Sequence, residues 1–131
     1  ISRNGRVDGY YSGYTFANQL GVTTQVPYMV EIVSNNASAR VREVNLHGRR
    51  VLLRKARVLV TKENYRILQF LDFLKDIDQY ADENDKILSD RIRKYVVDVQ
   101  IKKTEIDCYI KQYPDRIYRY IYEMRLYDVF A

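Results

Sequence analysis

The sequence is poor in the residues on which many catalytic and metal sites depend. Its 131 residues include one cysteine, one histidine and no tryptophan. One cysteine excludes an intrachain disulfide and a multi-cysteine zinc site, and one histidine argues against a histidine-based metal centre. We therefore expect neither a metal ion nor a cofactor.

The two rare residues themselves favour structural roles. Cys108 falls among Ile106, Tyr109 and Ile110 of an expected helix, which predicts a buried, unreactive thiol. His47 precedes Gly48 between two strand-like segments. This pair predicts a turn, because histidine tolerates a positive φ and glycine prefers one.

Long apolar runs are also missing. No apolar segment approaches the roughly 20 residues that a membrane-spanning helix needs. The first residues lack the basic-then-apolar pattern of a secretion signal. We therefore expect a cytoplasmic protein that does not bind membranes.

The order of hydrophobic patterns predicts one mixed domain over residues 1–131, sheet-rich at 1–60 and helical at 61–131. A hydrophobic content of 47% suits a modest core. We expect an α/β (α+β) fold in which a small sheet of three or four strands, mixed or antiparallel, is accompanied by one short N-terminal helix and about four C-terminal helices.

The first half begins with a short helix between Ser12 as N-cap and Gly21 at the position that needs a positive φ. Strands are expected at 28–33 and 40–46, the second with Val41 and either Val44 or Leu46 turned inward. Residues 51–53 and 58–60 are expected to form one bent strand or two short ones.

The second half has helical periodicity. Helices are expected from about Thr61 to Ile77, over 87–99, from a Thr104 cap to a stop before Pro114, and over 115–127. The acidic residues 82–85 lack the glycine and downstream glutamate of a calcium-binding loop, so a solvated loop that caps the next helix is expected. The apolar stripe of the last helix comprises Ile117, Tyr120, Ile121 and Met124.

Thirteen tyrosines are present, and several crowd the C-terminal helices. Tyrosine rings are enriched at protein interfaces, so these residues could form a face for a partner. The favoured interpretation is that they cover a small core from outside. The residues concerned are Tyr109, Tyr113, Tyr118, Tyr120, Tyr122 and Tyr127.

Positive charge is concentrated in the sheet-rich half, which holds nine Lys/Arg and three Asp/Glu. Seven of these cations fall within 18 residues and share the segment with one acid, Glu43. Such a segment can neutralise successive phosphates of DNA along one edge or face of a sheet. An ordinary solvated hairpin explains the pattern equally well. The candidate nucleic-acid-binding residues are Arg40, Arg42, Arg49, Arg50, Arg54, Lys55 and Arg57.

Residues for catalysis are sparse. Candidate groups for a metal-dependent nuclease are Asp8, Glu31, Glu43, Asp72 and Lys55. No Glu-x-Lys or Asp-x-Lys falls on an expected strand, however, and this pairing is what such nucleases use to bind Mg²⁺ and activate water. Asp72 is better explained as a solvent-side carboxylate or a buried tether to backbone amides. We therefore expect no catalytic residues and no enzyme.

Three segments resemble the AbiEi-like antitoxin family. Residues 9–27 are similar to the start of the family's domain. That start has a lead-in of tyrosine and small residues, a short helix ending in Leu-Gly, and then Thr-Thr-Gln-Val-Pro before a strand. Residues 61–72 and 111–116 resemble later family segments. Val22, Ala17 and the tyrosine-rich tail depart from the family pattern.

This resemblance implies a C-terminal antitoxin domain of a bacterial toxin–antitoxin (abortive-infection) system. Such antitoxins counter a nucleotidyltransferase-like toxin and repress their own operon through an N-terminal winged-helix domain, which is not visible in this sequence. The chain begins at Ile1, so a fragment of a longer regulator is expected. The resemblance implies DNA binding assisted by basic residues and no catalytic residue. The alternatives are a nucleic-acid-binding or protein-interaction domain outside any toxin pair, or a small nuclease.

Overall fold

The computed structural model describes residues 2–3, 6–25, 29–80 and 85–131. Its strands are β1 (Ser2–Arg3), β2 (Arg6–Val7), β3 (Gly9–Tyr11), β4 (Val30–Ser34), β5 (Val41–Leu46) and β6 (Arg49–Lys55). Its helices are α1 (Gly13–Leu20), α2 (Tyr65–Lys75), α3 (Ile77–Tyr80), α4 (Asp85–Val99), α5 (Lys103–Tyr109) and α6 (Arg116–Glu123), with 3₁₀ turns at Ile110–Gln112 and Leu126–Asp128. The expected mixed α/β fold is confirmed.

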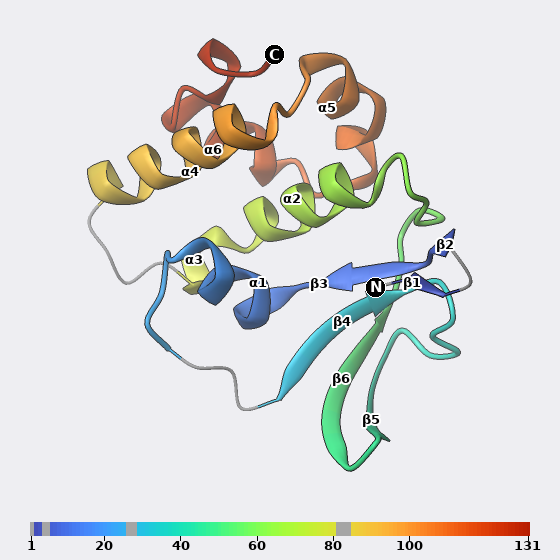
Figure 1. Cartoon of the computed structure of the whole chain (residues 1–131). Coiled ribbons are helices and arrows are strands. Elements are labelled where there is room, and N and C mark those ends of the chain that lie inside the picture. The colour runs from blue at the N-terminus through green and yellow to red at the C-terminus, as the bar shows by residue number, and fades with distance from the viewer. Residues whose placement is uncertain (1, 4–5, 26–28, 81–84) are drawn as a thin grey trace.

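The main sheet has the strand order β3-β4-β6-β5. Strands β4 and β6 are parallel, and the other neighbours are antiparallel. Strands β1 and β2 form a separate two-stranded pair. The helices lie to one side of the sheet, and the β5–β6 turn extends away from them (Figure 1). The sheet is therefore covered at β3 and exposed toward β5.

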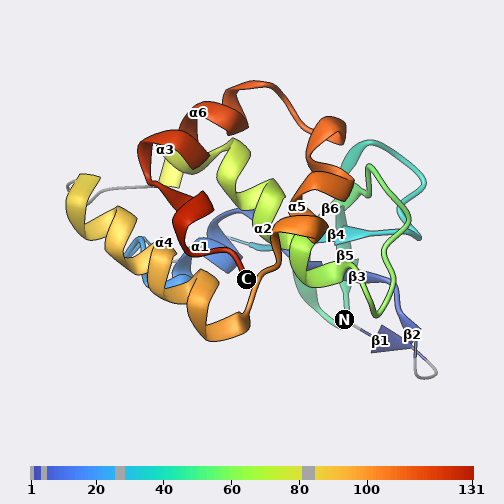
Figure 2. The same cartoon turned by 90° about the horizontal axis from the view of Figure 1, so that it is seen from above.

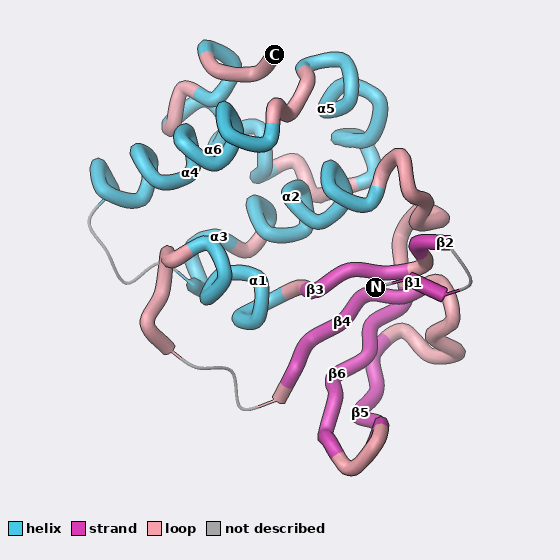
Figure 3. Tube along the Cα trace, in the orientation of Figure 1, coloured by secondary structure: helices cyan, strands magenta, loops and turns pink. Residues whose placement is uncertain are grey.

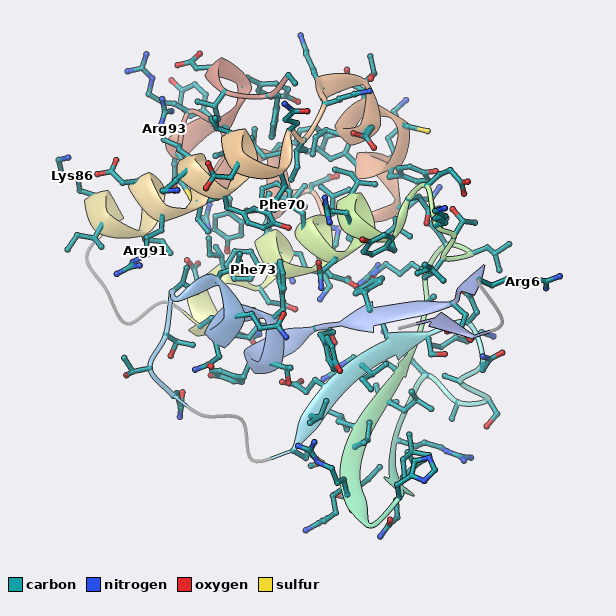
Figure 4. The ribbon with its side chains drawn as sticks, in the orientation of Figure 1. Arg6, Phe70, Phe73, Lys86, Arg91 and Arg93 are labelled. Carbon is teal, nitrogen blue, oxygen red and sulfur yellow. The ribbon has the colours of Figure 1, made fainter. Side chains whose placement is uncertain are left out.

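Helix α2 runs through the centre of the core, between β3 and the C-terminal helices (Figure 2). Its side chains Phe70, Leu71 and Leu74 are completely buried. Phe70 stacks on Tyr95 of α4, and Phe73 meets Phe16 of α1 edge to face. Figure 4 shows Phe70 and Phe73 between α2 and its neighbours, while Lys86 and Arg91 of α4 project outward. Helix α2 therefore packs against both the N-terminal part of the chain, through α1, and the C-terminal helices, through α4.

Several local predictions are confirmed. Gly21 follows α1 with φ of +76°, and His47 and Gly48 form the hairpin turn with φ of +52° and +80°. The four residues expected in the buried stripe are all buried: Ile117, Tyr120 and Ile121 in α6, and Met124 directly after its last residue.

The sheet differs from expectation at its free end. Val41 and Leu46 are exposed and Val44 is only half-buried, because β5 is an edge strand beyond the helical layer. Residues 58–60 form no strand. The side chain of Asn35 instead bonds both the N–H and the C=O of Val60 at 2.8 Å, which replaces the partners that a strand would supply.

Helix boundaries also differ. The expected helix at 61–77 begins at Tyr65 and breaks at Asp76. The N-cap of α5 is Lys102, not Thr104, which lies inside the helix. Cys108 is exposed, so the prediction of a buried thiol was wrong. It lies on the outward side of α5, whereas Ile106 fills the core. The acidic residues 82–84 lie outside the described residues.

The tyrosines of the C-terminal part divide between two environments. Tyr113 and Tyr120 are buried, whereas Tyr118, Tyr122 and Tyr127 are exposed, Tyr122 by 82%. The expectation that tyrosines cover the core is therefore met by Tyr113 and Tyr120, and the face for a partner stays a prediction. Within the described ranges, no helix has the length and apolar character needed to cross a membrane.

Candidate functional site

The predicted basic residues lie along the β5–β6 hairpin and just beyond its ends (Figure 3). Strand register decides which way each one points. Arg54 pairs with Val33, which pairs with Tyr10 on the helix-covered side of β3. Directly paired residues share a face of the sheet. Arg54 therefore lies on the helix-facing side, and so does Arg50 four residues before it.

Arg42 and Arg49 lie on the opposite side of the hairpin. Arg42 pairs with Leu53, and Arg49 pairs with Leu46. Side chains alternate along a strand, so these two arginines point away from the side that carries Arg54. The cations therefore do not share one face of the sheet but lie on both sides of the hairpin.

The cations differ in their partners. Arg50 pairs with Glu43 at 2.5 Å, and Arg54 lies 3.9 Å from Glu31. Arg57 donates to the Gln112 carbonyl at 3.2 Å and lies over the ring of Tyr113. Among the described residues, no carboxylate lies within 4 Å of four of the cations. These four are Arg40, Arg42, Arg49 and Lys55.

A cavity of about 620 Å³ opens on the helix-facing side of the hairpin, between β6 and the α2–α3 segment. Its walls are highly charged. Five cations and three carboxylates line it, together with Ser12 and Tyr80. The cations are Arg40, Arg54, Lys55, Arg57 and Lys75, and the carboxylates are Glu31, Asp72 and Asp76.

The three carboxylates form the less accessible part of the cavity, since their side chains are only 13–17% exposed. Glu31 accepts a hydrogen bond from the Tyr14 backbone N–H at 2.7 Å, which satisfies one free N–H at the start of α1. Asp76 forms ion pairs with Lys75 and, at 3.0 Å, with Arg116 of α6. The carboxylates are thus held in place by the surrounding fold.

Asp72 is linked to the sheet through Tyr10. The Tyr10 hydroxyl donates a hydrogen bond to Asp72 Oδ2, and Lys75 Nζ lies 3.9 Å from Oδ1. Burial raises the pKa of the Asp72 carboxyl, although the Tyr10 hydrogen bond and Lys75 act in the opposite direction. Burial, followed by the charge of Asp72, raises the pKa of Tyr10. Asp72 is therefore anchored as expected, but its hydrogen-bond partner is the Tyr10 hydroxyl and not backbone amides.

Tyr80 lies close to the same charges. Burial is the main cause that raises the pKa of its hydroxyl, and the carboxylates of Asp76 and Glu31 raise it further. Its ring meets Tyr14 edge to face with centroids 5.0 Å apart. Both rings add aromatic surface to the wall of the cavity.

The residues considered for catalysis are only partly brought together. Glu31, Asp72 and Lys55 line the cavity. Asp8 instead accepts a hydrogen bond from Asn36, and Glu43 lies on the exposed hairpin with Arg50. Within the part of the chain that the structure describes, no group of three or more His, Cys, Asp or Glu side chains is arranged to hold a metal ion.

Sequence reasoning missed several residues of the cavity: Ser12, Lys75, Asp76 and Tyr80. Lys75 and Asp76 occupy the break between α2 and α3, which the continuous apolar periodicity through Ile77 conceals. The polar pair Lys75-Asp76 is the one local feature of the sequence that could have predicted the break.

Comparisons with known proteins give no relative. No family model matches the chain, and neither a curated protein nor a solved structure is significantly similar to it. The resemblance of residues 9–27 to AbiEi-like antitoxins therefore stays a prediction.

Proposed function

We propose that this chain is a non-catalytic regulatory domain that binds the phosphate backbone of DNA through its β5–β6 hairpin, as part of an AbiEi-like antitoxin. The observation that carries DNA binding is the exposed hairpin itself. It projects from the helical part of the molecule (Figure 1). The strand register places cations on both of its sides.

The charges of the hairpin support this proposal physically. Arg42 and Arg49 are exposed and have no carboxylate within 4 Å among the described residues. Their charges are therefore available to phosphates and are not neutralised internally. Arginine also presents a planar fork of donors that matches phosphate oxygens. Such contacts release counterions, so the affinity falls as salt rises.

A direct test uses fluorescence anisotropy of a labelled DNA duplex with the full chain at 50 and 200 mM salt. We expect weak binding at the lower concentration that is lost at the higher one. The double variant Arg42→Glu/Arg49→Glu should abolish it. Lys86→Glu/Lys94→Glu on α4 makes the same change in net charge at exposed positions away from the hairpin and should retain most of the affinity. Absence of binding by the unaltered chain at tens of micromolar would overturn the proposal.

The antitoxin role rests on the resemblance of residues 9–27, 61–72 and 111–116. Its test is genetic. Expression of the parent protein should rescue bacterial growth from a nucleotidyltransferase-like toxin encoded beside it. A DNA-binding domain with no such neighbour would favour the alternative of a nucleic-acid-binding module outside any toxin pair. A cytoplasmic location belongs to the same proposal, because bacterial DNA is in the cytoplasm.

Catalysis is the weaker candidate. Glu31, Asp72 and Lys55 do line one cavity, which is the observation in favour of a nuclease. Two of these groups already have structural partners, however: Glu31 caps α1 and Asp72 holds Tyr10. Cations also lie 3.9 Å from each carboxylate and would oppose a bound Mg²⁺. Binding therefore explains the arrangement better than metal-assisted hydrolysis.

A further inference from the structure

We propose that the cavity between β6 and α2 binds one nucleotide, with the base on the carboxylates of its inner wall and the phosphate on the cations around its opening. This deepens the proposed function, on which it rests in one respect: the cavity shares Arg54 and Lys55 with the hairpin proposed to bind DNA.

The first support is a set of polar atoms with unused hydrogen-bonding capacity. Ser12 is 94% buried, and its Oγ has no hydrogen-bond partner among the described residues. Within the described part of the chain, the polar group recorded near Glu31 Oε1 and near Asp72 Oδ1 is in each case a cation at 3.9 Å, which is beyond hydrogen-bond distance. All three residues line the same cavity. A buried polar atom without a partner is costly, so a ligand that completes these bonds is favoured.

The chemistry of these atoms selects a ligand that donates hydrogen bonds. Ionised carboxylates only accept, and a serine hydroxyl both accepts and donates. Adenine, cytosine and guanine carry an exocyclic amino group that donates to such oxygens, whereas uracil and thymine do not. The inner wall therefore fits an amino-bearing base. Tyr14 and Tyr80 add aromatic surface on which a ring can pack.

The balance of charge selects an anion. Five cations outnumber three carboxylates around the cavity. The side chain of Arg54 is 45% exposed, whereas that of its neighbour Glu31 is 14% exposed. The negative groups are thus set back, and four of the five cations lie nearer to solvent; Lys75, at 18% exposed, lies among the carboxylates. A nucleotide matches this order, with donors at one end and phosphate at the other.

Two simpler ligands match less well. A lysine or arginine side chain of a peptide would donate to Glu31 and Asp72 but would be repelled by the excess of cations. Inorganic phosphate would be drawn to the cations but would leave Ser12, Glu31 and Asp72 unsatisfied. The volume of about 620 Å³ also lies within the usual range for small-molecule sites and exceeds what phosphate needs.

The test is isothermal titration calorimetry of the full chain with AMP, CMP, GMP and UMP, with inorganic phosphate and a short lysine-rich peptide as competing probes. We expect at least one of the three amino-bearing nucleotides to bind about tenfold more tightly than UMP or phosphate. The proposal is overturned if no nucleotide binds at millimolar concentration, if UMP or phosphate binds equally well, or if the peptide binds more tightly than every nucleotide.

Two variants assign the binding to this cavity. Ser12→Ala removes an unpartnered hydroxyl, so its melting temperature should stay the same or rise while nucleotide affinity falls severalfold. Asp72→Asn keeps the shape and the Tyr10 acceptor but removes the charge, and should lower the affinity about tenfold. Ser89→Ala and Asp98→Asn on α4 are matched controls that should change neither quantity. Unchanged nucleotide affinity in folded Ser12→Ala and Asp72→Asn would exclude this cavity as the nucleotide-binding site.

The two proposals fail separately. Arg42→Glu/Arg49→Glu alters the side of the hairpin that faces away from the cavity, so it should abolish duplex binding and preserve nucleotide binding. Asp72→Asn should lower nucleotide affinity and preserve duplex binding. Duplex binding without nucleotide binding would refute the cavity alone, and nucleotide binding without duplex binding would refute the hairpin alone.

Discussion

The Tyr10 hydroxyl donates a hydrogen bond to Asp72 and so joins strand β3 to helix α2 across 62 residues of sequence. The bond belongs to the core as much as to the cavity. Tyr10 is 3% exposed, and the Tyr113 hydroxyl, which donates to the Leu68 carbonyl at 3.3 Å, lies beside it. A charged acceptor makes such a bond stronger than one between neutral groups.

Replacement of Tyr10 by phenylalanine should therefore destabilise the protein by about 1.5–3 kcal/mol at pH 7, since the bond to a charged group is lost and a buried carboxylate loses its donor. Urea denaturation measures this. Tyr122→Phe, at a position that is 82% exposed, is the control and should have almost no effect. Equal stability of the two variants would show that the bond contributes nothing.

The effect of Tyr10→Phe should also depend on pH. The pKa of Asp72 is raised by burial, so its contribution to stability is present below the ordinary value of 3.8 and is lost as pH rises through the folded-state value. The Tyr10 bond lowers this pKa, so its removal raises it further. The variant should thus lose more stability at pH 7 than at pH 4. A loss that is the same at both values would contradict this.

Gly21 provides a second test of stability. Its φ of +76° is strained for any residue with a Cβ, and most of all for a β-branched one. We expect Gly21→Val to cost about 1–2 kcal/mol and Gly21→Asn to cost less. Thermal melts of the two variants decide this, and equal melting points would mean that the left-handed conformation is not required.

Asn35 is the polar residue that fixes the path of residues 58–60. Its amide group both donates to and accepts from the Val60 backbone at 2.8 Å. Asn35→Ala should cost about 1–3 kcal/mol in urea denaturation, because two backbone groups lose their partners. Asn36→Ala removes an exposed bond to Asp8 and should cost less than about 0.5 kcal/mol. Similar losses in both variants would argue that the Asn35 bonds are not special.

Arg49 tests the nature of DNA binding. It has no carboxylate within 4 Å among the described residues, so Arg49→Gln should remove one phosphate contact. The salt dependence of duplex affinity should then become shallower by about one in the slope of log K against log salt. Arg116→Gln, which removes an internal ion pair with Asp76, should leave that slope unchanged. A slope unaffected by Arg49→Gln would remove this residue from the interface.

The sequence correctly predicted the structural features that depend on residues close together in the chain. The apolar period of α2, the positive φ of Gly21 and the His47–Gly48 turn all follow from neighbours in the chain, and each is found in the structure. The helix-like period across Asp76 did not reveal the break there, because the residues on both sides face the same core. Asp76 at the break forms an ion pair with Arg116, which lies 40 residues away in the sequence.

The candidate site was predictable only in part for the same reason. The basic segment was visible in the sequence, but which side each arginine takes depends on the parallel pairing of β4 with β6. The cavity itself arises where Glu31, Arg54 and Asp72 meet from three elements. No local pattern links these positions, so the sequence predicted them only as isolated candidates.

The last prediction concerns catalysis. If the domain acts by binding, alanine variants at Asp8, Glu31, Asp72 and Lys55 should each retain antitoxin activity in the parent protein wherever they fold. The physical reason is one of magnitude. Loss of an essential catalytic group lowers a rate by several orders of magnitude, whereas one contact in an extended binding surface contributes about 1 kcal/mol or less. Growth rescue in the presence of the toxin measures the outcome.

Folding must be checked separately in this experiment, because Asp72 and Glu31 also hold Tyr10 and the start of α1. Asp72→Asn and Glu31→Gln preserve those shapes and remove only the charge. Lys55 has no carboxylate within 4 Å among the described residues, so Lys55→Ala should fold normally. Complete loss of rescue by a well-folded variant at any of these positions would mean that the altered residue is an essential reacting group and that the antitoxin is an enzyme.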